Sequence, residues 1–232
     1  MKISITKHWL PVGIFLAIFA LMSMQPSLAQ TNSASQTNSA QVAPSINAGE
    51  LLYSDDFTTR KESRWSTFSD ANISRFYKDG KYHYKVKNGG LSYWSFAGKD
   101  YQDFVLEVNT TQETGPDDND YGVVFRYSNP DNYSLFLISG DGFYGYAKME
   151  NNQWKVPVKW VRSDALKQGN STNTLRLAAL GENLALYANG VKLADFVDSS
   201  PRSGDIGFWV ETFQEGNVGI AFDDLKVWAA NR

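Results

Sequence analysis

The sequence predicts an all-β domain in which two antiparallel sheets pack as a jelly-roll sandwich. Beyond Glu50, short runs of apolar and aromatic residues alternate with polar ones, which is the pattern of half-buried strands. Hardly any segment repeats its apolar residues at the helical period. Turn residues separate the runs roughly every 8–12 residues, and this spacing favours a sandwich or a barrel over alternating strands and helices.

The predicted strands are rich in Val, Ile, Tyr, Phe and Trp. In chain order they cover residues 75–78, 81–86, 91–96, 104–110, 121–127, 133–139, 143–149, 153–160, 174–180, 184–188, 191–197, 205–212 and 218–228. Asp79-Gly80 and Asn189-Gly190 predict two-residue hairpin turns, because both central positions of such a turn need positive φ. Asp141-Gly142 suits a slightly longer connection. One helix-like segment, 163–168, is expected to form a single turn capped by Ser163.

Residues 1–29 have the layout of a secretory signal peptide. Lys2 and Lys7 precede an apolar run at 10–22, and small residues lead to an expected cleavage after Ala29. The competing interpretation is a membrane anchor, but a spanning helix needs about 20 apolar residues and this run is shorter. We therefore expect export to the periplasm or the exterior, with no membrane span after cleavage.

A polar segment separates this signal from the strands. Residues 30–49 contain the pentad QTNSA twice and no charged residue, so they predict a disordered polar linker. Residues 50–230 then form the β-sandwich domain.

The composition excludes several classes of function. Lys plus Arg total 22 and Asp plus Glu total 25, and no basic cluster is present, so a nucleic-acid partner is not expected. The absence of Cys excludes disulfide scaffolds, zinc ribbons, iron–sulfur sites and thiol nucleophiles.

Several segments carry a resemblance to a known family. GVVFRY, DNY and LIS within 115–139, LYANG within 184–196, and IAFDDLKVW at 220–228 occur in an order that resembles bacterial secreted domains of the concanavalin A-like, laminin-G-like jelly-roll superfamily. Within it, the sequence is most similar to the 3-keto-disaccharide hydrolase domain family, over essentially all of 50–230. The resemblance implies the fold; the superfamily includes sugar-binding modules, glycosidases and adhesion domains.

A catalytic set is not evident in the sequence. The E-x-D-x-x-E string of jelly-roll glucanases is absent, and Glu211 and Glu215 have no partner Asp. Beyond the signal peptide only His83 could serve as a histidine base or ligand, and its alternation with Tyr82 and Tyr84 predicts an outward surface side chain. We assign no catalytic residue, which favours a non-enzyme; carboxylate-only, calcium-assisted chemistry stays open.

Two acidic groups could hold a structural calcium ion, and no other cofactor is expected. Asp117, Asp118 and Asp120 precede a strand, where they suit either Ca²⁺ or an ordinary turn. Asp56 and Asp223 belong to the two ends of the domain, and terminal jelly-roll strands often pair. There the alternatives are an ion or hydrogen bonds to neighbouring groups.

Aromatic residues are the most function-like feature of the sequence. Strand alternation puts Trp209, Glu211 and Phe213 on the face opposite Phe208. Similar reasoning directs further side chains outward, namely Tyr144, Tyr146, Lys148 and Arg126. On a concave sheet, such rings and charged groups would suit a sugar, whose C–H faces stack on rings and whose hydroxyls bond to charges. The alternative is a satellite core in which the rings cover one another.

These observations predict an exported, non-catalytic β-sandwich that binds carbohydrate or cell-envelope polysaccharide through an aromatic and charged concave face. Two alternatives stay open. The first is a sugar hydrolase of the 3-keto-disaccharide hydrolase type, and the second is a structural or adhesion module that binds protein.

Overall fold

The computed structural model describes residues 45–60 and 63–232. The predicted signal peptide at 1–29 and the linker up to residue 44 lie outside the described residues. In the part of the chain that is described, no helix is long and apolar enough to cross a membrane.

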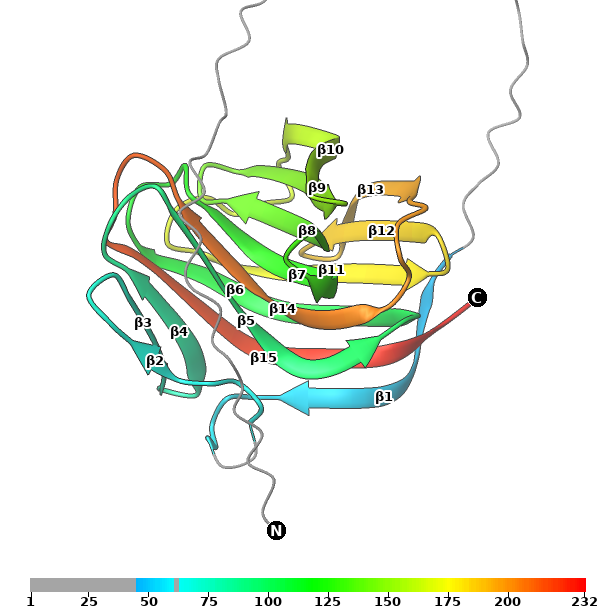
Figure 1. The fold of residues 1–232 in the computed structure, drawn as a ribbon, viewed down its shortest axis with the longest axis horizontal. Coiled ribbons are helices and arrows are strands. Elements are labelled where there is room, and N and C mark those ends of the chain that lie inside the picture. The colour runs from blue at the N-terminus through cyan, green and yellow to red at the C-terminus, as the bar shows by residue number, and fades with distance from the viewer. Residues whose placement is uncertain (1–44, 61–62) are drawn as a thin grey trace, which may run out of the picture.

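Alternating strand patterns produce strands at every predicted position, and the all-β prediction is confirmed. The strands are β1 (Asn47–Asp55), β2 (Phe68–Ser69), β3 (Ile73–Lys78), β4 (Lys81–Val86), β5 (Leu91–Tyr101), β6 (Phe104–Thr114), β7 (Asp120–Asn129), β8 (Asn132–Ser139), β9 (Phe143–Glu150), β10 (Gln153–Arg162), β11 (Thr172–Leu180), β12 (Asn183–Ala188), β13 (Val191–Val197), β14 (Gly204–Thr212) and β15 (Val218–Asn231). They form two antiparallel sheets packed face to face (Figure 1).

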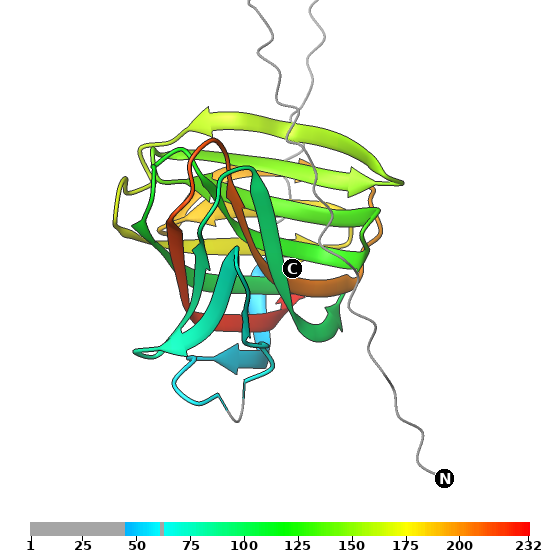
Figure 2. The same cartoon turned by 60° about the vertical axis from the view of Figure 1, so that its left-hand side comes forward.

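The strand order explains how distant segments meet. The six-stranded sheet runs β10-β9-β8-β7-β14-β5, and Figure 2 shows these strands stacked downward from β10 at the top. The nine-stranded sheet runs β13-β12-β11-β6-β15-β4-β3-β2. In it β1 pairs with β15, the blue and red strands side by side in Figure 1, as expected for terminal strands.

The N-terminal boundary of the domain differs from the sequence prediction. Strand β1 begins at Asn47, before the expected domain start at residue 50, because its pairing with β15 extends to Asn47↔Asn231. Segment 163–168 forms the expected single turn at Ser163: Leu166 N–H donates to the Ser163 carbonyl (3.1 Å), and the Ser163 hydroxyl accepts from Ala165 N–H (3.3 Å).

The hairpin turns follow the predicted chemistry. Asp79-Gly80 and Asn189-Gly190 all have positive φ, between 51° and 81°. A turn that the sequence reasoning missed, Asn151-Asn152, joins β9 to β10 in the same way, with φ of 52° and 60°. Its signal was available, since Asn tolerates the left-handed region better than most residues.

Aromatic packing between the sheets forms the main core. The Phe208 ring of β14 stacks on Trp65 (4.2 Å between centroids) and on Phe222 of β15 (4.0 Å). Phe57 and Tyr82 complete the surrounding ring contacts. Since Phe208 is fully buried between the layers, its neighbours Gly207 and Trp209 must project from the other face of the six-stranded sheet.

We expect Phe208→Ala to lower the free energy of unfolding by about 3–5 kcal/mol, because it removes a ring that packs on both sides and leaves a cavity. Urea denaturation of the folded variant measures this. As the control, Val197→Ala on β13, which is 68% exposed, should change stability by less than about 0.5 kcal/mol. Equal effects of the two substitutions would contradict the central position of Phe208.

Candidate functional site

The outer face of the six-stranded sheet, the face directed away from the nine-stranded sheet, carries its own group of rings. We call this group the outer aromatic cluster: Val124, Leu135, Leu137 and Trp209, with the partly buried Trp94, Phe96, Tyr127, Tyr133 and Trp160 packed against them. Leu137 belongs to this cluster because it follows the outward parity of β8.

Trp209 lies on the predicted face, but the expectation that its ring is exposed to solvent is wrong. Its side chain is only 4% exposed. Trp94 of β5 stacks on one side of it, with centroids 5.1 Å apart and planes 5° from parallel, and Tyr133 of β8 stacks at 5.9 Å and 30°. The rings of neighbouring strands therefore cover one another, as in the satellite-core alternative.

The ring that remains open is Trp154, which is 51% exposed on the edge strand β10. It meets Tyr133 edge to face at 5.8 Å and 88°. The sequence reasoning did not select Trp154 as a binding ring, although its position directly after the Asn151-Asn152 turn is a signal for exposure.

Two carboxyl groups lie next to each other on this same face. Asp120 at the start of β7 and Glu211 near the end of β14 are directly paired in register. Side chains opposite each other in an antiparallel pair are about 5 Å apart at Cβ. Glu211 is partly buried and accepts a hydrogen bond from Trp209 Nε1 (3.4 Å). This links the carboxyl pair to the outer aromatic cluster.

Both carboxyls have a raised pKa. Burial raises the pKa of Asp120 well above its usual range, and the charges of Glu211, Asp141 and Asp118 raise it further. Burial also raises the pKa of Glu211, against hydrogen bonds from Ser92 and Trp209. Because neighbouring carboxyls resist ionising together, the pair can present one protonated and one ionised group, which is an acid beside a base.

The sequence analysis considered Asp120 as a calcium ligand or a turn residue, and it found no partner Asp for Glu211. Their adjacency depends on the pairing of β7 with β14, which no local pattern reveals. Phe213, predicted to share the face of Glu211, lies beyond the end of β14, where its N–H donates to Asn119 Oδ1 (3.3 Å); it is not part of the outer aromatic cluster.

The predicted outward side chains of β9 point the other way, which corrects the sequence prediction. Tyr144 and Tyr146 do share a face, but they are register partners of the core residues Ile138 and Phe136, so that face is the inner one. The Tyr144 hydroxyl donates to the Leu193 carbonyl (2.8 Å), and the Tyr146 hydroxyl donates to Asp198. Neither ring can serve as an open sugar platform.

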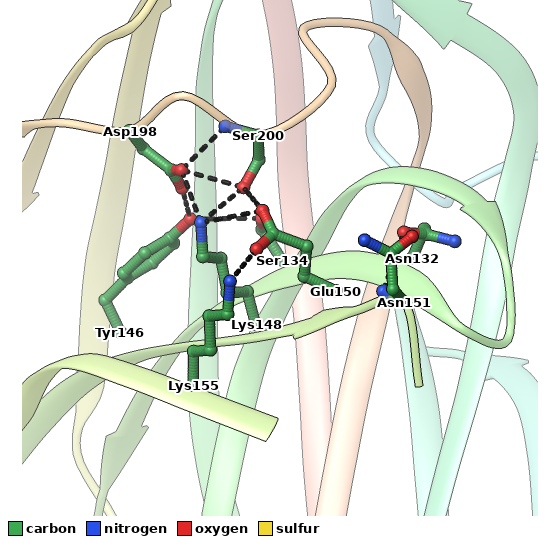
Figure 3. Close-up of polar contacts among 9 residues, drawn as sticks. All are labelled: Asn132, Ser134, Tyr146, Lys148, Glu150, Asn151, Lys155, Asp198 and Ser200. Carbon is green, nitrogen blue, oxygen red and sulfur yellow. Dashed lines mark hydrogen bonds and ion pairs between the residues drawn. The ribbon is translucent and has the colours of Figure 1, made fainter. Parts of the chain in front are cut away.

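Lys148, on the same inner face, forms a buried ion cluster at the side of the sandwich. Figure 3 shows its ammonium between Asp198 Oδ1 (2.7 Å) and Glu150 Oε1 (3.2 Å). Lys155 pairs with the other Glu150 oxygen. Burial opposes ionisation of Asp198, but hydrogen bonds from Lys148, Tyr146 and Ser200 outweigh it and lower its pKa to about 2. The cluster ties the segment after β13 to β9.

Arg126 is also turned inward, contrary to the prediction. Its backbone has a φ of 53° at a break in the register between β7 and β8, and this bulge reverses the direction of the side chain. The guanidinium is buried, and Nη2 donates to the Gly181 carbonyl at the β11–β12 turn (2.6 Å). Arg126 therefore joins the two sheets.

His83 is another correction. It lies on the outer side of β4, but it is buried rather than exposed, since Phe76 stacks on its ring at 5.1 Å. Its Nδ1 lies 3.0 Å from Glu113 Oε2 and its Nε2 3.0 Å from the Lys78 carbonyl. Both ring nitrogens are thus occupied by the protein itself.

The candidate calcium ligands are engaged in local hydrogen bonds. Asp56 Oδ1 accepts from Thr58 N–H (3.0 Å) and from the Thr58 hydroxyl (2.7 Å), and Asp223 accepts from Asp224 N–H (2.7 Å). The two residues are close enough that the charge of Asp56 contributes to the raised pKa of Asp223.

In the other acidic group, the side chain of Asp117 accepts from Gln112 Nε2 (3.3 Å), Asp118 is exposed, and Asp120 is buried. Among residues 45–60 and 63–232, no three His, Asp or Glu side chains converge as metal ligands would. Structural calcium stays a prediction from the sequence.

Comparison with known proteins gives both a family and a fold. The sequence model of a family described as a 3-keto-alpha-glucoside-1,2-lyase-like domain matches residues 54–228. No curated protein matches the sequence significantly.

Solved structures with similar folds include carbohydrate-binding module CBM66 from Bacillus subtilis, with 16% identity, a TM-score of 0.58, and coverage of 72% of this chain and 96% of that one. A galectin-like protein of unknown function from Bacillus subtilis has 12% identity, a TM-score of 0.63, and coverage of 81% and 100%. A GH16 protein of the Bacteroides ovatus mixed-linkage glucan PUL, in complex with a G4G4G3G product, has 13% identity, a TM-score of 0.57, and coverage of 76% and 99%. The fold is thus a β-sandwich like those of carbohydrate-binding modules and glycosyl hydrolases.

The raised pKa of Asp120 leads to a prediction about stability. A carboxyl whose pKa is higher in the folded than in the unfolded chain stabilises the fold at acid pH, and this contribution is lost as pH rises through the folded value. We therefore expect Asp120→Asn to raise the free energy of unfolding at pH 7 by about 1–3 kcal/mol, the range for a buried polar group without a partner.

Urea denaturation at several pH values tests this, and the gain should shrink toward pH 4. The exposed neighbour Asp118→Asn is the control, with an expected change below about 0.5 kcal/mol. A loss of stability in Asp120→Asn at pH 7 would contradict the expected cost of ionising Asp120.

Proposed function

The chain belongs to the 3-keto-alpha-glucoside-1,2-lyase-like domain family, and from this premise we propose that it binds carbohydrate on the outer face of the six-stranded sheet. The observation that carries the proposal is the Asp120–Glu211 carboxyl pair beside the outer aromatic cluster. Carboxyl oxygens bond to sugar hydroxyls, and partly exposed rings cover the apolar faces of sugars.

The dimensions of this face favour an extended ligand. Along β8, residues 133–139 run from the Tyr133 and Trp154 contact to the strand position beside Asp120. A strand of that length advances about 20 Å. An oligosaccharide or a polysaccharide would therefore reach both Trp154 and Glu211, whereas a single sugar would contact only one end.

A second candidate function, cleavage of a 3-keto glycoside, is favoured by the raised pKa of both carboxyls. A keto group at C3 acidifies the hydrogen on C2, so a carboxylate can remove it. The C1=C2 double bond forms as the bond from C1 to the departing oxygen breaks, and a protonated carboxyl returns a proton to that oxygen. The partly exposed Glu211 suits the base and the buried Asp120 suits the acid.

Export completes the proposal. It rests on the signal-like pattern of residues 1–29, and it would place the domain in the periplasm or outside the cell, where polysaccharides are available. The alternative of a protein-binding envelope module stays a prediction.

We expect Trp154→Ala to weaken binding of an oligosaccharide selected on a glycan array by about tenfold, because burying one ring against a sugar contributes on the order of 1.5 kcal/mol. Isothermal calorimetry measures the loss. Val197→Ala, an exposed apolar side chain on the other sheet, is the matched control and should bind like the wild type. If the wild type binds no glycan on the array, the binding proposal fails.

For the second candidate, Glu211→Gln should lower the rate of elimination from a 3-keto glucoside at least 100-fold, the typical contribution of a positioned base. Formation of the unsaturated sugar is followed by its absorbance across a pH range, and the wild-type rate should be bell-shaped in pH. Glu215→Gln, an exposed residue nearby, is the control. If the wild type shows no turnover of the 3-keto glucoside, the second candidate fails and the binding proposal remains.

A further inference from the structure

Arg126 has bonding capacity that the protein leaves unused. Its side chain is 1% exposed, and only Nη2 is bonded, to the Gly181 carbonyl (2.6 Å). Within the described ranges, Nε and Nη1 are buried without a hydrogen-bond partner. Because leaving a buried donor unbonded costs free energy, and leaving a buried charge unpaired costs more, this arrangement suggests a partner from outside the chain.

The lysines near Arg126 are already paired with carboxylates. Lys148 pairs with Asp198 and Glu150, and Lys155 pairs with Glu150, as Figure 3 shows. Two lysines thus take up two carboxylates. Asp198 also accepts from Tyr146 and Ser200, so its oxygens are committed. The positive charge of Arg126 is the one without an ion-pair partner in this group.

Asp103 does not supply that partner either. It lies close enough to act on Arg126 electrostatically, but its Oδ1 accepts from Gly181 N–H (2.7 Å). Glu150, the remaining carboxylate nearby, lies between two lysines. Among the described residues, Arg126 therefore has no carboxylate within hydrogen-bonding distance.

A small cavity lies beside Arg126. Its walls include Arg126, Ser134, Glu150 and Ser200, with Tyr133 and Met149 on the side of the outer face. The free space is about 10 Å³, enough for one water-sized group. An oxygen of a carboxylate fits this space, whereas a whole sugar ring does not.

The cavity borders the open end of the outer aromatic cluster. Tyr133, one of its walls, touches the exposed ring of Trp154, and Met149, another wall, is the register partner of Trp154. A sugar lying on Trp154 would therefore have its substituents close to the mouth of the cavity.

We propose that this cavity is a subsite for the carboxylate of an acidic sugar, which bonds to Arg126 while the sugar ring lies against Trp154. The inference rests on the proposed carbohydrate function and adds a ligand class to it, the uronic acids. Arg126 acts as the specificity-determining residue because it discriminates a carboxylate from the hydroxymethyl group of a neutral sugar.

The test compares three probes at equal ionic strength by NMR titration: glucuronate, glucose, and acetate as a carboxylate without a sugar. The wild type should bind glucuronate about tenfold more tightly than either of the other two. Arg126→Gln should bind glucuronate and glucose equally. Trp154→Ala, an exposed substitution, should bind glucuronate no better than acetate.

The wild-type comparison needs no variant, so it stands even if Arg126→Gln does not fold. Equal affinity of the wild type for glucuronate and glucose overturns the acidic subsite and leaves the proposed function intact. Equal affinity for glucuronate and acetate, unchanged in Trp154→Ala, would support a carboxylate site at Arg126. The same result would show that the sugar ring makes no contribution, and it would contradict the proposed binding at Trp154.

Discussion

The packing of Phe208 between the two sheets is the constraint on which the rest of the structure depends. Its ring is held between Trp65 and Phe222, so the parity of β14 is decided at that point. Every second residue of the strand must then face outward, which brings Trp209 and Glu211 to the outer face. This contact between the sheets and the candidate site thus lie on the two faces of one strand.

Charge is handled differently on the two faces of the six-stranded sheet. On the inner side, Lys148 and Asp198 form a compensated, hydrogen-bonded ion pair that closes the side of the sandwich. On the outer side, Asp120 and Glu211 lie opposite each other. Among the described residues, no Lys or Arg side chain donates a hydrogen bond to either carboxyl. A buried carboxyl that has a raised pKa and no cationic partner is typical of functional sites.

The fold is shared by binding modules and hydrolases, so it does not separate these functions. What separates them is whether the carboxyl pair only bonds to hydroxyls or also transfers a proton. The aromatic contacts around it serve both cases, since Trp94 and Tyr133 hold Trp209 in place and Trp209 holds Glu211 by a hydrogen bond. Positioning of Glu211 therefore comes from rings that themselves are largely covered.

The sequence alone determined the strands, most of the tight turns and the division of each strand into two faces, because alternation and turn chemistry are local. It correctly grouped Tyr144 with Tyr146 and separated Phe208 from Trp209. Only the tertiary structure decided which face of a strand is buried. Both faces of β9 carry residues that could be buried, and the face that packs against the second sheet is the buried one. Likewise, Asp120 and Glu211 became neighbours through the pairing of β7 with β14, and a bulge turned Arg126 inward. Such long-range pairings and local breaks in register have no periodic signature that a sequence pattern can reveal.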